Sequence, residues 1–189
     1  MDVYSFCEEY ASEKILLRKC AKPDSLDLLK VYSDKLAVSL CNTDNCYGET
    51  FYYKTPEEMD KAIGYWEWEY NRRGFVRWSI VDRGSMCSVG TIELFKRSAE
   101  DYFDSVGLLR IDLRSDYEKE PFISELLELI LSFTYDTFSC SRIATKAVCS
   151  ACERIAALRK VGFELSEFPL IGHDGTEYRD YFECCRGTN

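Results

Sequence analysis

Residues 142–164, RIATKAVCSACERIAALRKVGFE, constrain the fold of this chain more than any other segment. In their first part, Ile143, Thr145 and Ala147 alternate with Ala144, Lys146 and Val148, a period-2 pattern with β-branched residues that is typical of a strand. Over 155–161 apolar residues recur at helical spacing, with alanines between them that favour a helix. Gly162 stands where a helix C-terminus needs a left-handed residue, and Phe163 follows it. The pattern predicts a strand, a short loop, a helix and another strand.

This segment resembles the C-terminal signature of the GNAT N-acetyltransferases, in the branch that acetylates ribosomal-protein N-termini and small amines. That branch typically reads IxTKAVPENxxSIRxLEKxGFE. The resemblance extends over nearly the whole chain, from about Lys14 to Cys184, in the order of the elements. The matching residues of the signature are Ile143, Thr145, Lys146, Ala147, Val148, Ile155, Leu158, Lys160, Gly162, Phe163 and Glu164.

Local signals predict the other elements. Thr55 as N-cap, Pro56 in the first turn and two following glutamates predict a helix that runs to about Arg72. Turn and polar residues over 40–53 predict a loop. We further expect strands over 14–19, 75–82, 86–97 and 105–113, helices from Pro23-Asp24 and over 125–140, and a hairpin around Asp174-Gly175.

The resemblance implies the GNAT fold. This is an α/β (α+β) architecture with a mixed, mostly antiparallel central sheet, whose strands splay apart and which helices flank. The length of the chain suits one core, so we expect a single domain over residues 1–189 with its core at about 14–184. Either a monomer or a homodimer is compatible with the resemblance.

Composition and charge limit the functional classes. The net charge of -9 argues against a nucleic-acid surface. It would attract cationic amines or basic peptides, although many proteins are acidic for solubility alone. No apolar run approaches the roughly 20 residues that cross a bilayer, and the first residues lack a secretory signal. We therefore expect a cytoplasmic protein with no membrane association.

The 10 cysteines are dispersed through the chain, which predicts reduced thiols and no disulfide framework. Cys149 and Cys152 form a CxxC without a second pair, and His173 is the only histidine. Zinc sites need a further pair of such ligands at fixed spacing. We therefore predict no metal site.

The resemblance also implies a cofactor, acetyl-CoA, and direct transfer of its acetyl group to an amine. In the family the pantetheine lies along the splayed strand and bonds to its backbone. The matching positions here are Leu109, Ile111 and Leu113. The family's diphosphate lies on main-chain amides at the start of the next helix, which corresponds to the surroundings of Lys119 and Phe122.

At that helix start the chain departs from the family's R/QxxGxG/A loop. Glu118 stands where the family has Arg or Gln, and Pro121 and Ile123 stand where it has small residues. Pro121 has no N–H to donate, Glu118 would repel a phosphate, and Ile123 is bulky where a backbone must come close. The first cofactor motif is therefore altered.

The second cofactor motif is altered as well. Cys149, Ala151 and Arg154 replace the Pro, Asn and Ser of the family signature. Two changed motifs predict a site that is lost or rebuilt. In a rebuilt site Arg154 would reach a phosphate. In the other interpretation the basic residues here are solvated and pair with Glu153 and Glu164; these residues are Arg142, Lys146, Arg154, Arg159 and Lys160.

Candidate catalytic groups are few. Glu93, in GTIEL, falls where many GNAT enzymes carry a glutamate that helps to deprotonate the amine. The alternative is an ordinary, outward-facing strand residue. The family often has a tyrosine as general acid where this chain has Leu158, and Ser150, Tyr178 and Tyr181 are the available substitutes.

An aromatic run accompanies the predicted helix and the strand after it. Such residues either line an acceptor pocket or belong to the core. The run consists of Tyr65, Trp66, Trp68, Tyr70, Phe75 and Trp78.

Two functional hypotheses follow. The first is an N-acetyltransferase that transfers acetyl from acetyl-CoA to a primary amine of a small molecule or of a protein N-terminus. The second is a pseudoenzyme: a GNAT-fold protein that has lost the family's CoA binding and acts as a non-catalytic binding or regulatory module. Fold alone does not decide between them.

Overall fold

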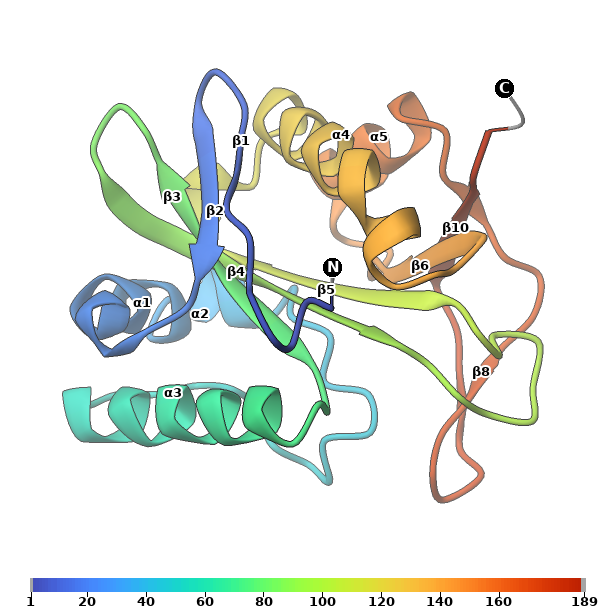
Figure 1. The fold of residues 1–189 in the computed structure, drawn as a ribbon, viewed down its shortest axis with the longest axis horizontal. Helices are drawn as coiled ribbons and strands as arrows, with labels where there is room; N and C mark the ends of the chain where they lie inside the picture. The colour runs from blue at the N-terminus through green and yellow to red at the C-terminus, as the bar shows by residue number, and fades with distance from the viewer. Residues whose placement is uncertain (1, 188–189) are drawn as a thin grey trace.

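A computed structural model describes residues 2–187 (Figure 1). The elements follow one another as β1 (Tyr10–Ala11), β2 (Ile15–Lys19), the 3₁₀ turn η1 (Lys22–Asp24), α1 (Ser25–Tyr32), α2 (Lys35–Val38), α3 (Pro56–Asn71), β3 (Val76–Asp82), β4 (Cys87–Lys96), β5 (Gly107–Leu113), the 3₁₀ turn η2 (Ser115–Tyr117), α4 (Glu120–Thr137), β6 (Arg142–Lys146), α5 (Cys152–Lys160), β7 (Glu164–Leu165), β8 (Leu170–Ile171), β9 (Glu177–Tyr178) and β10 (Tyr181–Cys185).

Among residues 2–187, eight strands form one sheet in the order β1-β2-β3-β4-β5-β6-β10-β7, and β8 pairs with β9. All neighbours in the large sheet are antiparallel except β5 and β6, which are parallel. Helices cover both faces: α4 and α5 lie above the sheet in Figure 1, and α1 and α3 lie below it. The predicted mixed, mostly antiparallel sheet with flanking helices is confirmed.

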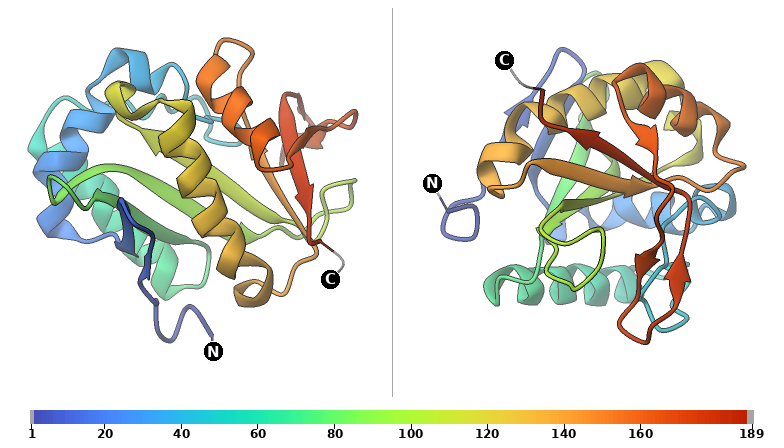
Figure 2. Two further views of the ribbon diagram at one scale, coloured as in Figure 1. Left: turned by 90° about the horizontal axis from the view of Figure 1, so that it is seen from above. Right: turned by 90° about the vertical axis from the view of Figure 1, so that its right-hand side faces the viewer.

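The two faces bury separate parts of the core. On the face that α4 covers, apolar residues of the helix such as Leu127 and Ile130 pack on strand residues such as Ile92. Below the sheet, Tyr32 of α1 and Met59 of α3 belong to a second cluster. The two further views show the same layers, with α4 and α5 side by side on one face and α3 on the opposite one (Figure 2).

The predicted start of α3 is confirmed. Thr55 Oγ1 accepts a hydrogen bond from the Glu58 N–H (3.2 Å), and the Glu58 carboxylate accepts one from the Thr55 N–H (3.1 Å). Pro56 occupies the first turn, where it sacrifices no helical hydrogen bond.

The next long helix differs from its prediction. α4 begins at Glu120, five residues before the expected start, and ends at Thr137. Pro121 is tolerated because it lies in the first turn, and buried Ile123 already contributes to the apolar face. The short elements α2 and β1 were not predicted, because four and two residues are too few to show a period.

The strand–loop–helix unit of residues 142–164 is confirmed. Helix α5 ends in a Schellman motif, in which the Phe163 N–H donates to the Leu158 carbonyl (2.9 Å) and the Gly162 N–H to the Arg159 carbonyl (3.2 Å). Gly162 has φ +92°, the left-handed conformation that its position requires. The strand that follows, β7, has only two residues.

The strands β5 and β6 part within the sheet. Their pairing is confined to Gly107–Leu109 of β5 and Ile143–Thr145 of β6. Strand β5 nevertheless stays paired with β4 as far as Leu113. We call the region between Arg110–Leu113 of β5 and the β6–α5 segment the splay. It leaves one backbone edge of β5 without a strand partner, as the resemblance implied.

Candidate active site

A cleft of about 1160 Å³ opens on the α3 face of the sheet. Its floor is formed by the start of β3, the end of β4 and the start of β5. Its walls are α3, the loop 45–53, the segment 97–101 and the turn between β8 and β9. Its charged side chains include Glu49, Glu58, Lys61, Glu69, Arg72, Arg77, Glu93, Arg97, Glu100, Asp101 and Arg110.

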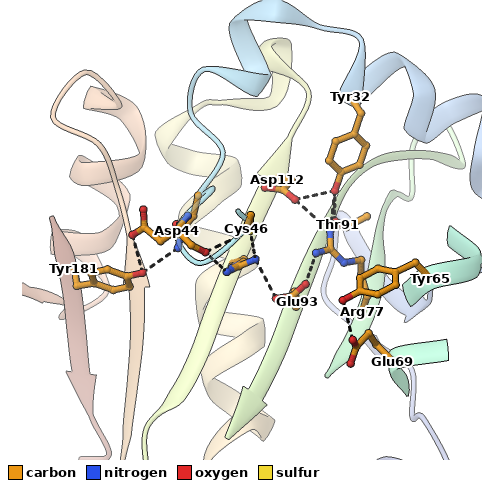
Figure 3. A network of polar contacts seen from close by, with 12 residues as sticks. Tyr32, Asp44, Cys46, Tyr65, Glu69, Arg77, Thr91, Glu93, Asp112 and Tyr181 are labelled. Carbon is orange, nitrogen blue, oxygen red and sulfur yellow. Dashed lines mark hydrogen bonds and ion pairs between the residues drawn. The ribbon is translucent and has the colours of Figure 1, made fainter. Parts of the chain in front are cut away.

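Glu93 lies at the floor of this cleft (Figure 3). Sheet register places it directly opposite Arg77 on β3 and Arg110 on β5, so the three side chains share one face. Its Oε2 accepts a hydrogen bond from Arg77 Nη2, and its Oε1 lies 3.6 Å from Arg110 Nη1. Glu93 is only 4% exposed, so the interpretation as an ordinary outward-facing residue is wrong.

The Arg77 guanidinium also holds the deeper half of the network. Its Nη1 donates to Tyr32 Oη (2.9 Å), Thr91 Oγ1 (3.1 Å) and Asp112 Oδ2 (3.3 Å), and its centre lies 4.1 Å from the Trp66 ring. Burial raises the pKa of the Tyr32 phenol well above its usual value, and the Asp112 carboxylate raises it further. This tyrosine therefore stays protonated and donates to Asp112 Oδ2 at 2.8 Å.

A second polar group ties the loop 45–53 to the sheet. Lys146 Nζ lies 2.7 Å from Asp44 Oδ1, and Tyr181 Oη donates to Asp44 Oδ2 at 3.0 Å. Arg110 Nη2 donates to the Asp44 carbonyl (2.7 Å), and its Nη1 donates to the Cys46 sulfur (3.3 Å). Arg110 therefore connects the wall of the cleft to Glu93 on its floor.

Sequence reasoning missed several members of these networks: Asp44, Arg77, Arg110 and Asp112. For Arg77, Arg110 and Asp112 the available signal was a charged residue within an apolar strand, as in FVRWSIVD and GLLRIDL. Charges at such positions are rarely buried unless they are paired.

The aromatic run divides between the two interpretations, except for Trp68, which is exposed outside the cleft. Tyr65, Trp66 and Phe75 line the cleft, whereas Tyr70 and Trp78 are buried in the core. Burial raises the pKa of Tyr65 to about 12, and its hydrogen bond to Glu69 acts in the same direction. The Tyr65 phenol at the wall of the cleft is therefore neutral at physiological pH.

Arg154 fills the splay. It is 2% exposed, and its Nη1 donates to the Ile111 carbonyl at 2.9 Å and to the Leu40 carbonyl at 3.3 Å. Its Nη2 bonds to Glu118 Oε1 in a buried ion pair. Leu109 and Leu113 flank Ile111 on β5, so the strand edge predicted to hold pantetheine is in contact with the protein's own guanidinium at its centre.

The main-chain donors at the start of α4 are also engaged. The Lys119 N–H donates to the Tyr117 carbonyl (2.7 Å), and the Glu120 N–H donates to Glu153 Oε2 (2.7 Å). Pro121 has no N–H. Within residues 2–187 this leaves the Phe122 N–H as the one first-turn amide of α4 without a partner.

The other basic residues of the predicted cluster do not pair as expected. Arg142 bonds to Glu183, Lys146 to Asp44 and Lys160 to Glu120, each at 2.7 Å. The prediction of pairing with Glu153 and Glu164 was therefore wrong for these residues. The reason is that β10, α4 and the segment between α2 and α3, which are distant in sequence, bring carboxylates closer than the local helix does.

The remaining predicted groups are scattered. Leu158 is buried, Ser150 is exposed in the loop before α5, and the Tyr181 hydroxyl is engaged by Asp44. All ten cysteines are free thiols, with Cys149 and Cys152 exposed. Across residues 2–187 no group of three potential ligand side chains is positioned to hold a metal ion, and no helix is long and apolar enough to cross a bilayer.

Comparison with known proteins identifies the family. The model of the Acetyltransferase (GNAT) domain matches residues 14–164, so the chain belongs to the GNAT acetyltransferase family. No curated protein matched the chain by sequence.

Solved structures share the fold. A GNAT-family acetyltransferase from Bacillus anthracis has 16% identity and a TM-score of 0.69, over 94% of this chain and 98% of that chain. The ribosomal-protein-S5-alanine acetyltransferase from Vibrio fischeri has 12% identity and a TM-score of 0.68, over 94% and 96%. A ribosomal L7/L12 alpha-N-protein acetyltransferase in complex with coenzyme A has 14% identity and a TM-score of 0.70, over 94% and 98%.

The residues present at the splay do not fit coenzyme A in the manner that the family resemblance implies. The Ile111 carbonyl already accepts a hydrogen bond from Arg154. At the start of α4, a diphosphate would find one free amide, a proline and the buried Glu118 carboxylate. Placing a phosphate close to the like-charged Glu118 carboxylate would cost on the order of 1 to 4 kcal/mol of binding free energy. The closed splay therefore contrasts with the open cleft on the other face.

Proposed function

We propose that this protein is an N-acetyltransferase whose acceptor is a primary amine of a small molecule or of a protein N-terminus. The observation that carries the proposal is the Glu93 carboxylate at the floor of an open cleft, within the GNAT fold. Two of the similar structures are named as ribosomal-protein acetyltransferases, which supports an amine or peptide acceptor.

The acceptor half of the reaction follows from the cleft. An ammonium group must lose a proton before its nitrogen can attack, and a carboxylate within reach serves as the base. Arg77 and Arg110 hold the Glu93 carboxylate in place, so the pairing of the strands determines the position of its oxygens. Among the exposed charged residues of the cleft, Glu49, Glu58 and Glu100 outnumber Lys61 and Arg72, which favours a cationic ligand. In this arrangement the splay does not fit the acetyl donor.

The test is an acetylation assay by mass spectrometry, with millimolar acetyl-CoA and a panel of small amines and peptides with free N-termini. We expect one amine class to be acetylated, and Glu93→Gln to lower kcat by about 10²- to 10⁴-fold, the usual contribution of a general base. Glu67→Gln, an exposed change on α3 outside the cleft, is the matched control.

Absence of acetylation for every amine would contradict the proposal. An unchanged rate in Glu93→Gln, with the variant folded, would contradict the role of Glu93 alone. Thermal unfolding checks folding, because removing this charge leaves Arg77 and Arg110 without their shared partner.

A second candidate function is binding of the same amine or peptide without transfer. The contact of Arg154 with the Ile111 carbonyl favours it, because that contact takes the strand edge on which the family holds its cofactor. A thermal-shift titration separates the two. A ligand at 100 times its dissociation constant stabilises the fold by about 2.7 kcal/mol. Stabilisation by an amine but not by acetyl-CoA, with no acetylation, would establish the binding module.

A further inference from the structure

We infer that the Arg154–Glu118 pair keeps the splay closed in the isolated chain, and that coenzyme A binds only after this pair separates. The inference rests on the proposed function in assuming that the splay is the cofactor site. It assigns a regulatory role to two residues that differ from the family signature.

The pair joins helix α5 to three other segments of the chain. Through Arg154 Nη1, helix α5 contacts the Ile111 carbonyl on β5 (2.9 Å) and the Leu40 carbonyl after α2 (3.3 Å). Through Nη2 it reaches Glu118, just before α4. The side chains of Arg154 and Glu118 are 3% and 8% exposed, so the guanidinium occupies the interior of the splay and not its rim.

The pair is incompletely satisfied. Arg154 Nε and Glu118 Oε2 are both buried, and neither has a hydrogen-bond partner among the described residues. Buried polar atoms without partners weaken the state that contains them. The closed arrangement is therefore one that a ligand with its own hydrogen-bonding groups can displace.

Glu153, the residue before Arg154, closes the second part of the site. Its Oε2 accepts the Glu120 N–H at 2.7 Å and so occupies a donor at the start of α4. Adjacent residues at the start of α5 thus engage both the strand edge and the helix start. A small displacement of the start of α5 would free the Ile111 carbonyl and the Glu120 amide together, and these are the two kinds of group to which the family resemblance assigns cofactor binding.

A closed majority state lowers the apparent affinity in proportion to the open fraction. If one molecule in a hundred is open, binding is a hundredfold weaker than the open state allows. The wild-type chain should therefore bind coenzyme A weakly, and substitutions that remove the pair should tighten binding.

The test measures binding of coenzyme A, which carries no acetyl group, by calorimetry and by thermal shift. The variant Glu118→Gln with Arg154→Ser places family-type residues at both positions and removes both charges together. We expect it to bind coenzyme A at least tenfold more tightly than the wild type. The control is Glu128→Gln with Arg159→Ser, which makes the same charge changes at exposed positions of α4 and α5 and should bind like the wild type.

Equal affinity of the wild type and the double variant would overturn the inference, whether both bind or neither does. If the double variant is unfolded by circular dichroism, Glu118→Gln alone is measured in its place, since it keeps the side-chain volume and weakens the same pair. It should then bind more tightly than Glu128→Gln, and no difference would again refute the closure.

The result of this binding test can be distinguished from the result of the acetylation assay that tests the proposed function. Binding that tightens in the double variant, with no amine acetylated by either protein, would leave the closure standing and refute the transferase. Acetylation by a wild type that binds coenzyme A as tightly as the double variant would support the transferase and refute the closure.

Discussion

Arg77 and Arg154 are both buried guanidiniums, but they stand in regions that differ in how the strands are arranged. Arg77 lies where three strands are fully paired, so register aligns it with Glu93, and Tyr32, Thr91 and the Asp112 carboxylate share its other side. Arg154 lies where two strands part, and there it meets one carboxylate and two carbonyls. The paired strands form the floor of an open cleft. The parted strand leaves a backbone carbonyl without a strand partner, and a side chain donates a hydrogen bond to it.

The largest expected effect comes from breaking the paired-strand network. Arg77→Ala would leave Glu93 and Asp112 buried without their shared cation. Loss of one partner of a buried pair typically costs about 3 to 5 kcal/mol, and we expect at least that loss in the free energy of unfolding by urea denaturation. Arg179→Ala, whose ion pair with Glu177 is exposed on both sides, should cost less than about 1 kcal/mol. Similar losses in the two variants would refute the structural importance of the network.

At the splay, removing one charge of a buried pair should affect the free energy of unfolding differently. Arg154→Ala alone leaves Glu118 as a buried, unpaired carboxylate and should cost about 3 kcal/mol. Adding Glu118→Ala should recover at least about 1 kcal/mol of this loss, because the orphaned charge is removed. A double-mutant cycle by urea denaturation measures the coupling. Strict additivity would mean that the two groups do not form a pair in solution.

Asp24 is a buried carboxylate that belongs to neither of these two regions. Burial acts to raise the pKa of Asp24, but hydrogen bonds from Arg18, Ser88, Ala21 and Ser79 outweigh it and leave the pKa below its ordinary value. Asp24→Asn should cost about 2 kcal/mol at neutral pH, through loss of charge-assisted hydrogen bonds.

The sign of the pH dependence follows from that lowered pKa. The contribution of Asp24 is fully present above the unfolded pKa of about 3.9 and is lost as the pH falls through the lower, folded value. The loss of stability between pH 5 and pH 2 should therefore be smaller in Asp24→Asn than in the wild type, as measured by thermal unfolding. Parallel pH profiles would show that this carboxyl has an ordinary pKa in the folded state.

The smallest expected effect concerns the wall of the cleft. Thr55→Ala removes the side-chain cap of α3, and substitutions of this type cost about 1 kcal/mol. Thr55→Ser keeps the hydroxyl and should remain close to wild type in chemical denaturation. Equal losses in the two variants would assign the effect to the methyl group and not to the cap.

Much of the fold could be predicted because its signals are local. Thr55 starts a helix by accepting a hydrogen bond from the Glu58 N–H, and Pro56 suits the first turn. Gly162 ends a helix because it adopts the left-handed backbone conformation. The family signature over 142–164 then implied the order and the parting of the strands. The start of α4 was misplaced, because the apolar period is clearer after Glu125 than in the turn that contains Pro121.

The candidate site was predictable only in part. Glu93 could be singled out by its position in GTIEL, but its partners Arg77 and Arg110 lie on other strands, and only register brings them opposite it. The sequence likewise marked Glu118 and Arg154 as departures from the family, each at its own position, without joining them.

Local sequence signals therefore account for the start of α3, the end of α5 and the two altered motifs, since each depends on neighbours within a few residues, whereas the strand order followed from the family resemblance. That one altered residue neutralises the other depends on the tertiary fold, because Arg154 and Glu118 meet across 36 positions of chain through the packing of α5 beside α4. An ion pair between distant segments depends on where whole elements lie, and no local pattern encodes that distance.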